Sequence, residues 1–111
     1  LNGQLPTELG YLTHLTEVQI SGQSLLTGSL PSEIGQLTAL KEGMDFASNQ
    51  LNGAIPTQLG NLDAMVGRLY LNVNSFTSAI PTELGNLREM TTYFYLQSNY
   101  LSSEIPTELG N

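Results

Sequence analysis

The sequence predicts an α/β solenoid, a right-handed superhelix of about four and a half coils with 25 residues in each coil. Three observations predict this fold. A proline motif recurs at a fixed period, a pair of alternating apolar residues comes once in each period, and an asparagine follows the last three of these pairs. The five prolines of the chain are each 25 residues apart, at Pro6, Pro31, Pro56, Pro81 and Pro106.

The proline motif predicts the convex side of each coil. The five prolines are embedded in the related segments LPTELGYL, LPSEIGQL, IPTQLGNL, IPTELGNL and IPTELGN. Proline fixes φ and cannot donate to a strand ladder, so it ends strand pairing at the outer side of the coil. We therefore predict short helical or 3-10 turns here, with Pro31, Pro56 and Pro81 in structural roles.

The alternating apolar pairs predict a parallel concave sheet. Alternation with period two is typical of a short strand with one buried face. Stacked coils place such strands side by side, about 4.8 Å apart, and each coil buries the leucines of its neighbour. The pairs are Val18 and Ile20, Met44 and Phe46, Leu69 and Leu71, and Phe94 and Leu96.

An asparagine follows each of the last three apolar pairs, at Asn49, Asn74 and Asn99. A buried amide is tolerated only when it is hydrogen-bonded. We therefore predict a structural role for these three residues, as a continuous ladder bonded to backbone groups of the turn.

Together these positions follow the pattern LxxLxxLxLxxNxLxGxIPxxLGx, and over essentially its whole length the chain resembles the plant-type leucine-rich repeat. Such repeats occur in plant receptor ectodomains and in polygalacturonase-inhibitor-like and algal repeat proteins. The resemblance implies an extracellular or cell-surface location and a concave sheet that binds proteins or glycans.

Each unit is one residue longer than this pattern. The extra residue is one of Leu25 and Leu26, then Gly43, Gly67, and one of Thr91 and Thr92. A small bulge or a longer turn is the simplest interpretation. A deliberate insertion or an error in the sequence are the alternatives.

The concave sheet carries the candidate ligand-binding residues. Outward positions on neighbouring strands bring Tyr70, Tyr93 and Tyr95 together, and tyrosine and arginine are favoured at binding hot spots. The alternative is that aromatic residues are there because they favour strands and stack across them. The flanking candidates are Arg68, Asp45, Asn72 and Gln97.

Residues 1–111 form one array that begins and ends within a unit and has no caps. Solenoid ends normally need capping because they expose core. We expect a segment of a longer array, or a subunit covered end to end by neighbours. The second possibility gives an alternative function, as part of a self-assembling extracellular fibre.

Composition excludes several functions. The chain has no cysteine, one histidine and a net charge of −7, so we expect no metal site, no cofactor and no nucleic-acid partner. No apolar run is long enough for a membrane span, and no triad-like grouping predicts catalysis. A third possible function is ice or mineral binding by the hydroxyl column Thr7, Ser32, Thr57, Thr82 and Thr107.

Overall fold

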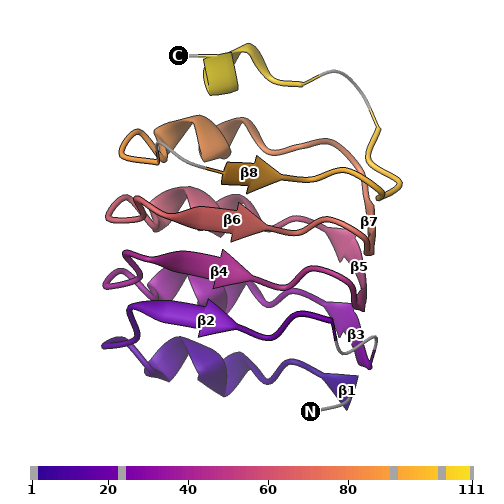
Figure 1. The fold of residues 1–111 in the computed structure, drawn as a ribbon, viewed down its shortest axis with the longest axis horizontal. Helices are drawn as coiled ribbons and strands as arrows, with labels where there is room; N and C mark the ends of the chain where they lie inside the picture. Colours follow the sequence, from indigo (N-terminus) through magenta and orange to yellow (C-terminus); the bar gives the residue numbers. More distant parts are fainter. Residues whose placement is uncertain (1–2, 23–24, 91–92, 103–104, 111) are drawn as a thin grey trace.

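The structure, a computed structural model, describes residues 3–22, 25–90, 93–102 and 105–110. These residues form a stack of similar coils, and the colours of Figure 1 rise through the stack from the N-terminus to the C-terminus. A complete coil holds a strand of one sheet, a strand of a second sheet and a 3-10 helix. The predicted solenoid is therefore confirmed.

The predicted concave sheet contains four parallel strands in the order β2-β4-β6-β8. Their central residues, Val18, Met44, Leu69 and Phe94, form one column in the register of the ladder. The first three of these side chains are buried in the core. The strands are β2 (Glu17–Gln19), β4 (Gly43–Asp45), β6 (Arg68–Tyr70) and β8 (Tyr93–Tyr95).

A second parallel sheet, for which no element was predicted, has the order β1-β3-β5-β7. In Figure 1 it lies along one side of the stack, where the chain leaves the concave strands. Leu26, Leu51 and Phe76 point from its strands into the core and are fully buried. The strands are β1 (Gly3–Gln4), β3 (Leu26–Ser29), β5 (Gln50–Ala54) and β7 (Ser75–Thr77).

The convex side consists of 3-10 helices, as predicted. An extended proline precedes each of the first four helices, and its carbonyl oxygen accepts the first helical hydrogen bond; Pro31 O, for example, accepts from Ile34 N at 3.1 Å. The fixed φ of proline thus sets the direction in which each helix begins. The helices are η1 (Thr7–Tyr11), η2 (Ser32–Gln36), η3 (Thr57–Asn61), η4 (Thr82–Asn86) and η5 (Thr107–Gly110).

The fold accommodates the extra residue in one way in the first coil and in another way in the next two coils. In the first coil, Leu26 is 0% exposed and belongs to the core, whereas Leu25 is 51% exposed. Leu25 is therefore the additional residue, and it lengthens the turn before β3.

In the second and third coils the extra residue forms a bulge. Lys41 N and Glu42 N both donate to Thr16 O, at 3.1 and 2.9 Å. Val66 N and Gly67 N both donate to Lys41 O, at 2.9 and 3.1 Å. Two successive residues facing one residue of the preceding coil define a β-bulge, here just before β4 and β6, which confirms that interpretation. Gly43, predicted as the extra residue of the second unit, lies instead within β4 and pairs with Glu17 and Arg68. The fourth extra residue, Thr91 or Thr92, lies outside the described residues.

Candidate ligand-binding face

The register of the concave sheet places its outward residues in columns that cross the stack. One column contains Glu17, Gly43, Arg68 and Tyr93, and the next contains Gln19, Asp45, Tyr70 and Tyr95. Backbone hydrogen bonds continue the alignment beyond the strands, because Ser48 N donates to Asn72 O and Val73 N donates to Gln97 O, both at 3.0 Å. The predicted candidate residues therefore occupy adjoining columns of one sheet.

Tyr70 and Tyr95 are stacked on each other. Their ring centroids are 4.8 Å apart and their planes differ by 9°. This distance equals the usual spacing of neighbouring strands, so the sheet itself holds the rings parallel. Tyr95 is 39% exposed and Tyr70 is half-buried, which leaves part of the pair available to a ligand. Tyr93 lies on the same strand as Tyr95, but its side chain lies outside the described part of the structure.

Asp45 differs from its predicted role on the ligand-binding surface. Its residue is only 8% exposed, and its Oδ1 accepts a hydrogen bond from Ala47 N at 3.0 Å. The short carboxylate is flanked in the register by the longer side chains of Gln19 and Tyr70. Asp45 therefore stabilises the end of its own strand, and we do not include it among the residues that contact a ligand.

Arg68 is also engaged within the chain. Its guanidinium Nη2 forms an ion pair with Glu17 Oε1 across the intervening Gly43, which has no side chain to separate them. Both side chains are partly exposed, so the pair contributes between about 0 and 1 kcal/mol to stability. A ligand can therefore compete for either partner at small cost.

Asn72 and Gln97 adjoin the tyrosine stack, and so does Val73, which was not among the predicted site residues. The amide oxygen Oδ1 of Asn72 is buried and has no hydrogen-bond partner among the described residues. Gln97 is exposed, and Val73 is 46% exposed although it is apolar. The sequence marks Val73 as unusual, because the equivalent residues in the other coils are the small residues Gly22, Ser48 and Ser98.

Comparison with known proteins shows which family has this geometry. A family model described as Leucine Rich Repeat matches residues 91–111. The plant peptide hormone receptor RGFR1 in complex with RGF2 is similar to this chain with a TM-score of 0.92 and 36% sequence identity, over 100% of this chain and 17% of that chain. The chain is a leucine-rich-repeat protein with repeats of the plant type.

Two further solved structures share this geometry. The BIR3–SERK2 complex from Arabidopsis thaliana has a TM-score of 0.85 and 34% identity, over 96% of this chain and 55% of that chain. A plant ice-binding protein has a TM-score of 0.85 and 31% identity, over 100% of this chain and 35% of that chain. This chain thus spans between 17% and 55% of the three structures. A comparison with curated proteins gave no match.

An asparagine ladder supports the concave face of this leucine-rich-repeat chain from behind. Asn74 is typical: its Oδ1 accepts from Leu51 N at 3.0 Å, and its Nδ2 donates to Phe46 O at 2.9 Å and to Leu71 O at 3.2 Å. Asn49 and Asn99 make the equivalent contacts in their own coils. The ladder connects each coil to the one before it and fixes the ends of the concave strands.

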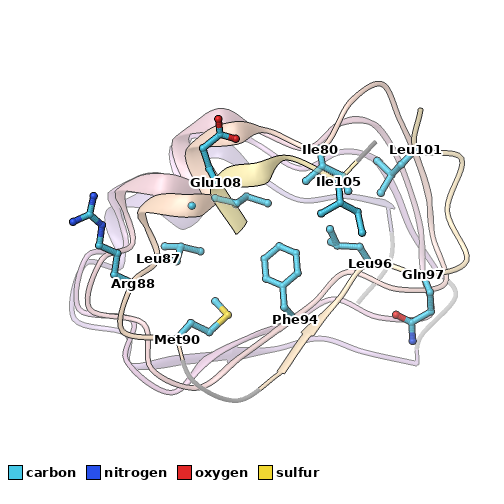
Figure 2. A pocket seen from close by; sticks show the side chains of 12 residues that line it. Ile80, Leu87, Arg88, Met90, Phe94, Leu96, Gln97, Leu101, Ile105 and Glu108 are labelled. Carbon is cyan, nitrogen blue, oxygen red and sulfur yellow. The ribbon is translucent and has the colours of Figure 1, made fainter. Parts of the chain in front are cut away.

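A cavity of about 580 Å³ lies at the C-terminal end of the leucine-rich-repeat stack, between β8 and η5. Figure 2 shows Met90, Phe94, Leu96 and Ile105 pointing toward its centre, with Arg88 and Glu108 at its rim. These apolar residues occupy repeat positions that are buried in the coils below. The cavity is therefore a continuation of the solenoid core.

The described part of the chain contains neither a metal-ligand cluster nor a membrane-spanning helix. No group of three or more His, Cys, Asp or Glu residues among the described residues could hold a metal ion. None of its helices has the length and hydrophobicity needed to cross a membrane.

Proposed function

We propose that this chain is a non-enzymatic recognition module of an extracellular or cell-surface protein, which binds a polypeptide partner on its concave face. The observation that carries the proposal is the partly exposed Tyr70–Tyr95 stack on β6 and β8 of that face. Two of the similar structures are complexes, one of a peptide hormone receptor with RGF2 and one of BIR3 with SERK2, and both support a polypeptide over a glycan.

The tyrosine stack is suited to binding because it is already ordered. A tyrosine has few rotatable bonds, so it offers a large contact area at a low entropic cost, together with a polar hydroxyl group. Stacking on neighbouring strands orders the rings before a ligand arrives, which reduces the entropy lost on binding. The adjoining amides of Gln97 and Asn72 can hydrogen-bond to a peptide main chain.

The double variant Tyr70→Ala/Tyr95→Ala tests this proposal. Short linear peptides would be selected from a phage-displayed library on the wild-type chain, synthesised, and measured by isothermal titration calorimetry. We expect the double variant to raise Kd at least about 30-fold, because truncation of a hot-spot residue costs about 2 kcal/mol or more.

The matched control is Thr57→Ala/Thr82→Ala, which removes two exposed side chains from the convex helices η3 and η4. This control should bind the selected peptides with unchanged Kd, and both variants should keep the wild-type circular dichroism spectrum. Equal binding by the tyrosine variant, or a library with no peptide enriched on the wild-type chain over the tyrosine variant, would contradict the proposal.

A second candidate function, ice binding, is favoured by the outer face of the second sheet. None of the residues in β1, β3, β5 and β7 is charged, although the whole chain carries a net charge of −7. The ladder places Ala54 beside Thr77, and an isolated bridge pairs Ala79 with Ser102. One of the similar structures is a plant ice-binding protein. The hydroxyl column of Thr57 and Thr82 is less suitable, because an acidic or amide side chain follows each hydroxyl.

Thermal hysteresis of the purified chain measures this second function directly. If the sheet binds ice, the wild-type chain will show hysteresis and Thr77→Glu will abolish it, because a charge on the face retains its own hydration shell. The matched variant Thr57→Glu, which changes an exposed threonine of η3, should keep full hysteresis. A wild-type chain without hysteresis, or equal loss in both variants, rules out this face. The fibre alternative is untested by these structures and stays a prediction.

A further inference from the structure

One position in every described coil has a left-handed backbone. Gly22, Ser48, Val73 and Ser98 occupy equivalent places after the concave strands, with φ values of 70°, 59°, 57° and 61°. The amide groups of this turn hold the geometry, because Val73 N donates to Gln97 O at 3.0 Å and Asn49 N donates to Val73 O at 3.2 Å. The turn that leads into the asparagine ladder therefore requires a positive φ.

Valine is poorly suited to this conformation. A β-branched side chain collides with the backbone at positive φ, which glycine avoids and small polar residues tolerate better. Burial in the core does not compensate for the strain, since Val73 is 46% exposed. Folding alone thus favours serine or glycine at this position, as in the other three coils, and gives no reason for valine.

Asn72, the residue before Val73, has a buried hydrogen-bond acceptor that no described residue satisfies. The Oδ1 atom of Asn72 is out of contact with solvent and has no hydrogen-bond partner among the described residues. A buried acceptor without a donor destabilises the free protein. The Asn72 side chain as a whole is partly exposed, so rotation can present its amide to a donor at the surface. Both residues belong to the coil that carries Tyr70.

We propose that Asn72 and Val73 form one edge of the peptide-binding surface, beside the Tyr70–Tyr95 stack. Val73 receives an apolar side chain of an extended peptide, and the amide oxygen of Asn72 accepts a hydrogen bond from the main-chain N–H of that peptide. Local strain that folding does not explain is typical of binding sites. This inference rests on the proposed function and names the kind of peptide residue that the surface selects.

The test combines stability and affinity, because the proposal expects them to change in opposite directions. Val73→Ser adopts the residue of the neighbouring coils, so Tm should rise by about 3 °C as strain is relieved. Its Kd for a peptide selected on the wild-type chain should increase at least about tenfold. Asn72→Ala should leave Tm unchanged or higher while it weakens binding of the same peptide.

The matched control is Ser48→Val, which introduces valine at the equivalent left-handed position of the neighbouring coil. It should lower Tm and leave Kd unchanged. A double-mutant cycle then pairs Val73→Ser with replacement of each apolar residue of the peptide by serine. The proposal requires a coupling of at least about threefold at one apolar peptide position.

The outcomes separate this inference from the proposed function. If the tyrosine variant loses binding while Val73→Ser is more stable and binds as the wild type does, the edge assignment is wrong and the concave face stands. If Val73→Ser lowers Tm, valine has a structural role and the assignment is again wrong. If the tyrosine variant binds normally, both proposals fail. Selection of a glycan by the chain, with no peptide enriched, also overturns both.

Discussion

Replacement of Asn74 by alanine is expected to lower the free energy of unfolding by about 3 kcal/mol. The substitution leaves the buried Leu51 N–H without its Asn74 Oδ1 acceptor, and an unpaired buried donor costs about 1–3 kcal/mol by itself. It also removes the Asn74 Nδ2 group, which donates hydrogen bonds to both Phe46 O and Leu71 O. Urea denaturation followed by circular dichroism measures the change.

The two carbonyl groups retain one partner each, which limits the expected loss. Phe46 O still accepts from Asn49 Nδ2 at 3.1 Å, and Leu71 O still accepts from Asn99 Nδ2 at 2.9 Å. The matched control is Asn52→Ala, an exposed asparagine in the second sheet, whose effect should stay within about 0.5 kcal/mol. A loss below about 1 kcal/mol for Asn74→Ala would show that the ladder does not hold the coils together.

The concave sheet and the convex helices could be predicted from the sequence because their signals repeat. The alternation of Leu69 and Leu71 and the prolines before each helix recur in every complete unit, so each local prediction supports the others. The second sheet was missed for a physical reason. Its strands contain Gly28 and Gly53 at positive φ, and glycine has a low strand propensity. These strands exist because neighbouring coils supply their pairing partners.

The candidate site could be predicted only in part. The period of the repeat was enough to bring Tyr70 and Tyr95 into one column, because register follows from the period. The burial of Asp45 could not be foreseen, since it depends on a hydrogen bond to Ala47 N and on the lengths of the flanking side chains. Val73 was missed because an apolar pattern carries no information about the sign of φ.

The bulge before β6 leads to the second large prediction, which concerns Gly67. A Cβ atom at this position would lie 1.8 Å from Glu42 O and 2.6 Å from Glu42 C. The Glu42 carbonyl is fixed, since it accepts a hydrogen bond from Arg68 N at 3.1 Å, so the backbone just before β4 cannot move aside without breaking this bond between the coils. We expect Gly67→Ala to lower the free energy of unfolding by about 2–4 kcal/mol, measured by urea denaturation.

Gly22→Ala is the control that separates this collision from backbone strain. Gly22 has a φ of 70°, and a Cβ atom there would meet nothing within 4 Å, so only the left-handed conformation opposes alanine. That strain costs about 1 kcal/mol. If Gly67→Ala is no more destabilising than Gly22→Ala, then the bulge can open without loss, and the extra residue of the repeat is a tolerated insertion. A larger loss for Gly67→Ala shows that the longer unit depends on glycine, because the bulge brings two backbones closer together than any side chain allows.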